Sequence, residues 1–167
     1  VVGEGGVAQG IGAAVAGRLA AEGATVIAAD RNLDGVERLA QELGERVIPF
    51  EIDVASRPSC DALAASIAER FGRLDGLLNN AAIFSTIRMA PFWEITEQEW
   101  DAIMNVNIKG VWLVTSALID LLRASGSASI VNIGSDSVVL GRSDYLHYVA
   151  SKGAVTGMTS SMSKELG

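Results

Sequence analysis

The stretch Gly6–Gly12, with the sequence GVAQGIG, decides the fold predicted for this chain, because it joins the end of a strand to the start of a helix. The apolar pair at residues 1–2 ends the strand, and a helix is predicted over residues 10–22. Glycines let the backbone approach a pyrophosphate closely, and a helix start offers free N–H groups and the positive end of the helix dipole. Together these features predict a dinucleotide-binding loop.

The spacing of these glycines, Gly-x3-Gly-x-Gly, differs from the commoner G-x-G-x-x-G pattern. A glycine cluster alone is also compatible with a flexible loop, so the prediction depends on the strand before it and the helix after it. The residues predicted to contact the nucleotide in this loop are Gly6, Gln9, Gly10, Ile11 and Gly12.

Asp30 ends the second predicted strand, eighteen residues beyond Gly12. A carboxylate at this place accepts hydrogen bonds from ribose hydroxyls and repels a 2′-phosphate, which favours NAD over NADP. Arg31 argues the other way, because a guanidinium can hold that phosphate. Asp53 and Val54, at the end of the third predicted strand, are candidates to flank the adenine. An aspartate that simply opens a helix explains Asp53 nearly as well.

Short apolar runs alternate with longer helical patterns along the chain. Strands are predicted over residues 1–2, 24–29, 46–52, 74–78 and 129–133, and helices over residues 10–22, 33–43, 59–71, 96–124 and 145–166. Thr96 and Glu99 resemble a capping box at the start of the fourth helix, which is either continuous or a broken pair of helices. This alternation predicts βαβ units, hence a parallel sheet with helices on both faces. Glycines or short polar residues follow all five strands, at the edge where open parallel sheets bind ligands. No linker divides residues 1–167, so one α/β domain is expected.

Tyr148 and Lys152 lie four residues apart in the last predicted helix and therefore share one of its faces. A tyrosine hydroxyl ordinarily ionises near pH ~10, and a neighbouring ammonium favours the phenolate form. The pair predicts a proton-transfer device, although such pairs also occur by chance on solvated helices. Tyr145 is the weaker candidate, because Val149 stands four residues after it.

The composition restricts the possible classes of function. Thirteen basic and twenty acidic residues give a formal net charge of −7 without a basic stripe, which argues against a nucleic-acid partner. Cys60 and His147 are the only residues of their types, which argues against a disulfide framework or a metal site. The apolar run at residues 111–122 contains Asp120 and is too short to span a bilayer. Without a visible signal peptide, a soluble, cytoplasmic protein is expected.

Four motifs in combination resemble the short-chain dehydrogenase/reductase family, and the resemblance covers essentially all 167 residues. They are Gly6–Gly12, Asn79-Asn80-Ala81, Ser135 and Tyr148-x3-Lys152. The resemblance implies an NAD(P)-dependent oxidoreductase with a Rossmann-type, doubly wound parallel sheet. Asn80 and Ala81 then join the residues expected to bind the cofactor.

The resemblance also implies a role for each catalytic residue. Tyr148 is expected to be the general acid/base, and Ser135 to hold the substrate oxygen through its hydroxyl. Lys152 is expected to bind the nicotinamide ribose and to favour the tyrosine phenolate. Asn107 matches the family's helix asparagine, which supports a proton-relay water. Asn105 is the competing candidate, and a kink or cap of the helix is the alternative for both asparagines.

The chain departs from the family pattern at several places. Gly5 stands where the family usually has threonine, and Ala82 where a glycine commonly follows Asn-Asn-Ala. Only two residues of the first strand are present, and the last C-terminal strands of the family have no counterpart. An incomplete record of a longer protein is therefore expected.

The predicted function is a reversible hydride transfer between a secondary alcohol or ketone and NAD, with NADP less favoured. Two alternatives stay open: an NADPH-dependent reductase of 3-oxoacyl thioesters, and a non-catalytic nucleotide-binding protein of the same fold. The connections at residues 83–95 and 137–147 are expected to line the substrate pocket. The resemblance implies a homotetramer or dimer, formed through the helices that contain residues 111–122 and 145–166.

Overall fold

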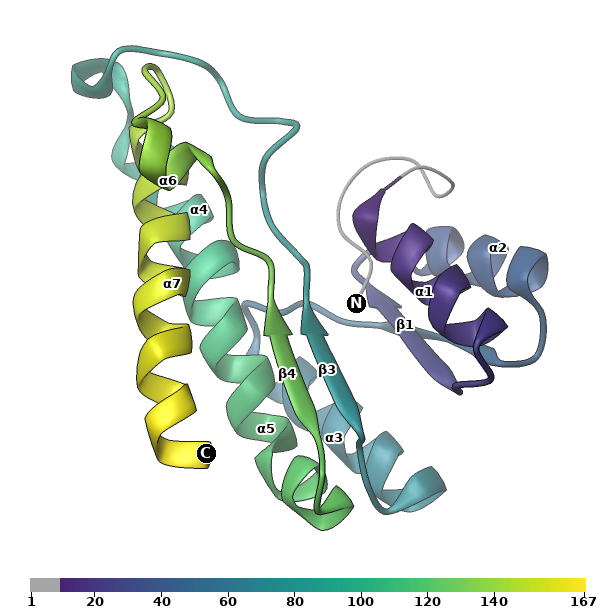
Figure 1. Ribbon diagram of the computed structural model, residues 1–167. Helices are drawn as coiled ribbons and strands as arrows, with labels where there is room; N and C mark the ends of the chain where they lie inside the picture. The colour runs from purple at the N-terminus through teal and green to yellow at the C-terminus, as the bar shows by residue number, and fades with distance from the viewer. Residues whose placement is uncertain (1–9) are drawn as a thin grey trace.

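The structure is a computed structural model that describes residues 10–167. Its strands are β1 (Val26–Asp30), β2 (Val47–Glu51), β3 (Gly76–Asn79) and β4 (Ser129–Asn132). Its longer helices are α1 (Ile11–Ala21), α2 (Leu33–Leu43), α3 (Arg57–Phe71), α4 (Glu97–Met104), α5 (Gly110–Ser125) and α7 (Leu146–Leu166). Strands and helices alternate along the chain, as the sequence pattern predicts (Figure 1). The strand predicted at residues 1–2 lies outside the described residues.

The strands form two parallel pairs. In one pair Val26 lies opposite Val47, and β1 and β2 stay in register as far as Asp30 and Glu51. In the other pair β3 and β4 run side by side, from Gly76 opposite Ser129 onward (Figure 1). Within each pair, parallel pairing brings the residues that follow the two strands to the same edge.

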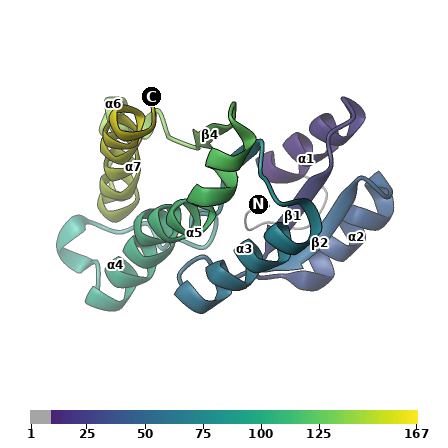
Figure 2. The same cartoon turned by 90° about the horizontal axis from the view of Figure 1, so that it is seen from below.

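Helices cover both faces of the β1–β2 pair (Figure 2). Successive residues of a strand point to opposite faces. Ala28 accordingly packs in a cluster with residues of α1 and α2, such as Ala13 and Val36. Its neighbour Ala29 packs in the larger cluster with residues of α3 and α5, such as Leu63 and Leu118. The predicted cover on both faces is therefore confirmed.

Local capping sets the ends of several helices. Thr96 and Glu99 form the predicted capping box at the start of α4. Helix α3 begins two residues before the predicted start at residue 59, because the Ser56 side chain accepts a hydrogen bond from the Ser59 N–H. Pro58 is tolerated there, since the first turn of a helix needs no N–H donor.

Residues 97–125 make one long helix, in which the π-helical segment η2 (Asn105–Lys109) joins α4 to α5. This helix is longer than the apolar run at residues 111–122, and by length and composition alone it is sufficient to cross a membrane. Leu113, Val114 and Leu118 are at most 3% exposed, however, and belong to the larger core cluster. Packing in the core of the domain therefore explains why this helix is so apolar.

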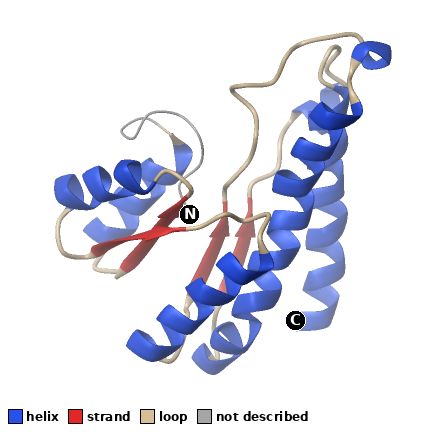
Figure 3. Cartoon of the chain, turned by 180° about the vertical axis from the view of Figure 1, so that it is seen from behind, coloured by secondary structure: helices blue, strands red, loops and turns tan. Residues whose placement is uncertain are grey.

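Two connections lie close together beyond the carboxyl ends of β3 and β4. The connection after β3 runs to the 3-10 helix η1 (Phe92–Glu94), and the connection after β4 contains the short helix α6 (Ser137–Leu140). Both lie beside the amino-terminal end of α7 (Figures 1 and 3). A hydrogen bond of 3.2 Å from the Ala90 N–H to the Asp144 carbonyl joins the two connections.

Candidate active site

Tyr148 and Lys152 lie on neighbouring turns of α7, and both are buried. The Lys152 ammonium nitrogen is 5.8 Å from the centre of the Tyr148 ring. That nitrogen also donates a 2.7 Å hydrogen bond to the carbonyl of Ile133, just after β4. Burial lowers the pKa of Lys152 below its ordinary value. The predicted contact between the two side chains is confirmed, and their catalytic roles stay predictions.

Asn107 connects three parts of the site from within η2. Its Oδ1 accepts a 2.8 Å hydrogen bond from the Ile83 N–H, and its Nδ2 donates to the Ile83 carbonyl at 3.2 Å. The same Nδ2 donates to the Ser151 hydroxyl at 3.1 Å. Asn107 is 1% exposed, whereas the competing candidate Asn105 lies on the exposed side of the helix. This geometry favours Asn107 over Asn105.

Ser151 is a member of this site that the sequence reasoning missed. Its hydroxyl is fully buried, accepts the bond from Asn107 and donates a 2.7 Å bond to the Tyr148 carbonyl. A serine next to a lysine is ordinary in a helix, so only its position one turn beyond Tyr148 gave a signal. Ser151 fixes the helical turn that carries Tyr148 relative to Asn107.

Ser135 follows β4, two residues beyond Ile133, and is partly buried. Its Oγ lies 2.8 Å from the Ser137 Oγ and accepts a 3.2 Å hydrogen bond from the Ser137 N–H. Among residues 10–167, this hydroxyl therefore pairs with the start of α6, and no hydrogen bond joins it to Tyr148. Lys152 binds the carbonyl of Ile133, two residues before Ser135, so both residues adjoin the segment that follows β4.

The predicted nucleotide loop is described only from Gly10 onward, and Gly6 and Gln9 lie outside the described residues. Gly10 caps α1, and its carbonyl accepts the 3.1 Å hydrogen bond of the Ala14 N–H. The first turn of α1 contains no acidic residue and no side-chain cap, while Ile11 is exposed and Gly12 buried. Within residues 10–167, no side-chain cap occupies this helix start, which fits the phosphate of a dinucleotide.

Asp30 is the last residue of β1, and its Oδ1 accepts a 2.9 Å hydrogen bond from the Asn32 N–H. Asn32 in turn caps α2 by accepting a bond from the Gly35 N–H. Arg31, the residue that argues for NADP, is exposed. The carboxylate thus sits at the end of the strand, where the sequence predicts it.

Asp53 and Val54, the residues predicted to flank the adenine, differ in their surroundings. The Asp53 carboxylate is exposed and accepts a 2.9 Å hydrogen bond from the Ala55 N–H, which is the local turn that the simpler alternative expects. Val54 is 8% exposed, and a Cβ added to Gly110 would lie only 2.9 Å from its Cγ2. The Val54 side chain therefore packs against α5, and only its backbone is left to face a nucleotide.

The Asn79-Asn80-Ala81 motif ends β3. The Asn79 Nδ2 donates hydrogen bonds to Thr115 of α5 at 3.0 Å and to Asn132 of β4 at 2.8 Å. Asn80 is partly buried, and Ala81 packs at the edge of the larger core cluster. Asn79 therefore has a structural part in the sheet, and Asn80 and Ala81 occupy the edge where ligands of such sheets bind.

An aromatic group adjoins Tyr148. The Phe84 ring lies 4.9 Å from the Tyr148 ring and 6.2 Å from the Tyr145 ring, centre to centre. The Arg142 guanidinium lies 4.6 Å above the Tyr145 ring. Arg88 instead binds Glu99 at 2.8 Å, which holds the pKa of that carboxyl at about 2.

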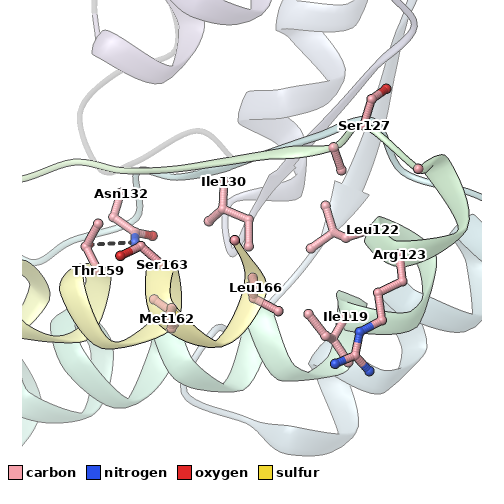
Figure 4. A pocket seen from close by; sticks show the side chains of 13 residues that line it. Ile119, Leu122, Arg123, Ser127, Ile130, Asn132, Thr159, Met162, Ser163 and Leu166 are labelled. Atoms are coloured by element: carbon pink, nitrogen blue, oxygen red, sulfur yellow. Dashed lines mark hydrogen bonds between the residues drawn. The ribbon is translucent and has the colours of Figure 1, made fainter.

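A separate apolar groove lies between α5, β4 and α7 (Figure 4). Its apolar lining comes from Ile119, Leu122, Ile130, Met162 and Leu166. The groove extends to Ser127 and Ala128, which precede β4, so it runs toward the end of the strand opposite Ser135. It is not part of the candidate active site.

These features define a class of protein, the Rossmann-type α/β domains with a Tyr–Lys pair beside the carboxyl ends of parallel strands. The sequence profile described as short chain dehydrogenase matches residues 4–167, and the chain belongs to this family. The predicted family and fold are thereby confirmed.

Two relatives and one solved structure illustrate the similarity. The 3-oxoacyl-acyl-carrier-protein reductase of Thermotoga maritima is 38% identical over 164 residues, which are 96% of this chain and 65% of the relative. The D-threitol dehydrogenase of Mycolicibacterium smegmatis is 36% identical over 165 residues, 97% of this chain and 62% of the relative. A 3-ketoacyl-acyl-carrier-protein reductase from Brucella melitensis, crystallised with NADH, matches with a TM-score of 0.86 and 32% identity. That match covers 93% of this chain and 64% of the other.

Proposed function

We propose that the protein containing this chain catalyses a reversible, nicotinamide-dependent oxidation of a secondary alcohol to a ketone. The contact between Tyr148 and Lys152, 5.8 Å from ring centre to ammonium nitrogen, supports this proposal most directly. The chain spans slightly less than two thirds of the relatives it matches, so the activity is proposed for the complete protein.

The described residues fit a nicotinamide dinucleotide. The start of α1 offers N–H groups that no side chain of the described residues caps, and Asp30 stands where a ribose hydroxyl would donate. Lys152 uses one of its three N–H donors on Ile133, which leaves donors for ribose hydroxyls. Because the Asp30 carboxylate favours NAD, we propose that the protein uses NAD in preference to NADP.

In the proposed mechanism Tyr148 exchanges a proton with the substrate oxygen. The Lys152 ammonium stabilises the phenolate through its positive charge, in a buried setting where the attraction is stronger than in water. Ser135 is proposed to hold the substrate oxygen, and Asn107 to maintain the relay that returns the proton to solvent. When bound, the cofactor supplies the hydride acceptor.

Replacing Tyr148 by phenylalanine tests the proposal. Because this change removes the acid/base but keeps the ring, turnover is expected to fall by at least about a hundredfold. The affinity for NADH, measured by fluorescence titration, is expected to stay within about twofold, since the cofactor residues remain. A Tyr148→Phe variant that retains most of its turnover would exclude Tyr148 from the reaction.

A reductase of 3-oxoacyl thioesters is the second candidate, because the Thermotoga relative is named for that activity. A clear preference for NADPH, with turnover of acyl thioesters and not of free alcohols, would favour it. A non-catalytic nucleotide-binding protein would bind NADH without oxidising any alcohol in a panel.

Three further proposals are the cellular location, the oligomeric state and the class of substrate. We propose a cytoplasmic homo-oligomer, a tetramer or dimer, that acts on small alcohols or ketones. The apolar outer residues of α5, such as Trp112 with 54% exposure, support an interface. Light scattering of the complete protein tests the oligomeric state.

A further inference from the structure

We infer that Phe84 determines substrate specificity and selects secondary alcohols whose carbinol carbon belongs to, or adjoins, an apolar ring. The inference deepens the proposed function and rests on it. It differs from the mechanism above, because Phe84 has no part in proton transfer.

The Phe84 ring lies against the proposed acid/base. It lies 4.9 Å from the Tyr148 ring at a tilt of 45°, and it stacks on the Tyr145 ring at 6.2 Å and 29°. Tyr145 and Tyr148 also meet edge to face at 6.4 Å. These three rings form a continuous aromatic wall that includes the proposed acid/base.

The three rings of the wall differ in their exposure. Tyr145 and Tyr148 are each 9% exposed, whereas Phe84 is 46% exposed. Phe84 is therefore the member of the wall that still offers an open apolar surface. A substrate whose oxygen reaches Tyr148 has an aromatic face available beside it, and apolar rings gain by covering such a face.

Hydrogen bonds hold the backbone beside Phe84 in place. Asn107 binds both the N–H and the carbonyl of Ile83, the residue before Phe84. Farther along the same connection, the Ala90 N–H binds the Asp144 carbonyl. A wall anchored in this way can discriminate between shapes, because it does not move freely to accommodate a different substrate.

The connection after β4 presents exposed apolar side chains. On α6, which packs on α7, Val139 is 89% exposed and Leu140 is 75% exposed. Arg88 is engaged by Glu99 and by the carbonyl of Glu94. Val139 and Leu140 therefore add exposed apolar surface to the connection after β4, and the Arg142 guanidinium lies over the face of the Tyr145 ring. A cyclic apolar alcohol has one hydroxyl to satisfy, whereas every hydroxyl of an open-chain polyol needs a partner when it leaves water.

The test compares two alcohols in the complete natural protein with NAD. Cyclohexanol has an apolar ring at the carbinol carbon, and D-threitol is an open-chain polyol. We expect a higher kcat/KM for cyclohexanol. In Phe84→Ala this value is expected to fall about tenfold, mainly through KM, because an apolar contact with the substrate is lost. The value for D-threitol is expected to change less than about twofold.

Two further variants make the result specific. Phe84→Leu keeps an apolar side chain without the ring, and it is expected to lose about threefold for cyclohexanol. Phe71→Ala is the matched control: Phe71 is 43% exposed at the carboxyl end of α3, next to Arg70 and outside the aromatic wall. It is expected to leave the ratio of the two alcohols unchanged.

Several outcomes would overturn the inference. A wild-type preference for D-threitol would do so, and so would an equal loss for both alcohols in Phe84→Leu. If both alcohols are oxidised and the ratio is the same in wild type and both Phe84 variants, only the inference fails. If the wild type oxidises no alcohol while it binds NADH, the proposed function fails first.

Discussion

The nucleotide half and the catalytic half of this site hold their polar groups by hydrogen bonds of very different sequence range. At the ends of β1 and β2, the Asp30 and Asp53 carboxylates each accept a local bond from the N–H two residues later. In the catalytic half, two buried side chains make distant bonds: Asn107 binds Ser151, 44 residues away, and Lys152 binds the carbonyl of Ile133, 19 residues away.

Because of this difference, the two halves are expected to respond differently to amino-acid substitutions. A local bond orders a turn, and its loss is confined to that turn. A buried long-range bond joins elements that are far apart in the sequence, and its loss leaves a buried donor or acceptor without a partner. Single substitutions are therefore expected to affect stability more in the catalytic half, and to affect cofactor preference more in the nucleotide half.

The largest effect is expected for Asn107→Ala. The change leaves the Ile83 N–H and carbonyl without their partner and removes a bond from Ser151, so the free energy of unfolding is expected to fall by about 2–3 kcal/mol. Turnover should fall with it, since Asn107 orders the connection beside Tyr148. Urea unfolding measures the first quantity and NADH production the second.

Asn105→Ala is the matched control, because Asn105 is exposed and lies in the same π-helical segment. Its unfolding free energy is expected to stay within about 0.5 kcal/mol of the wild type. Equal losses in the two variants would mean that the segment, and not the long-range bonds, determines stability.

A smaller effect, confined to the cofactor, is expected for Asp30→Ala. Loss of the carboxylate removes a repulsion toward the 2′-phosphate, so the ratio of kcat/KM for NAD to that for NADP should fall about tenfold. Asp34→Ala, on the first turn of α2, serves as a control for charge alone. An unchanged ratio in Asp30→Ala would remove this carboxylate from cofactor selection.

The smallest effect is expected from His147, whose Nδ1 is the only buried side-chain polar atom without a hydrogen-bond partner in residues 10–167. Burial lowers its pKa below the ordinary value; Glu99 opposes this effect and Arg88 adds to it. The unfolded chain therefore binds this proton more readily, so stability is complete above about pH 6.5 and decreases as pH falls through the lowered pKa.

The variant His147→Gln should weaken this dependence on pH. The difference in the urea midpoint between about pH 7.5 and about pH 5 is expected to be smaller in the variant than in the wild type. Identical differences in the two proteins would assign the acid sensitivity to other groups.

The sequence predicted those features that depend on neighbouring residues. The Thr96–Glu99 capping box and the limits of α2 at Leu33 and Leu43 match the predicted ones, because capping and helical periodicity are local properties. The contact of Tyr148 with Lys152 was predictable for the same reason, since residues four apart in a helix are neighbours.

Features that depend on distant residues were not predictable in this way. The bond between Asn107 and Ser151 needs two elements to meet in space, and neither residue type signals a partner by itself. The short helices η1 and α6 were missed because three or four residues are too few to show a period. For residues 105–109 the sequence left a kink or a broken pair of helices open, but it did not predict a π-helical turn, because a shift in the apolar pattern does not say which hydrogen bonds accommodate it.

That segment, Asn105–Lys109, also has a consequence for the evolution of this helix. Each residue of an α-helix advances the direction of the side chains by about 100°, so a turn with an extra residue offsets everything after it. The apolar stripe of α5 is therefore out of phase with that of α4. Deleting one residue here would make the helix more regular, yet it would rotate either the stripe or Asn107 away from its present neighbours. Insertions and deletions in these five residues should consequently be rarer than substitutions.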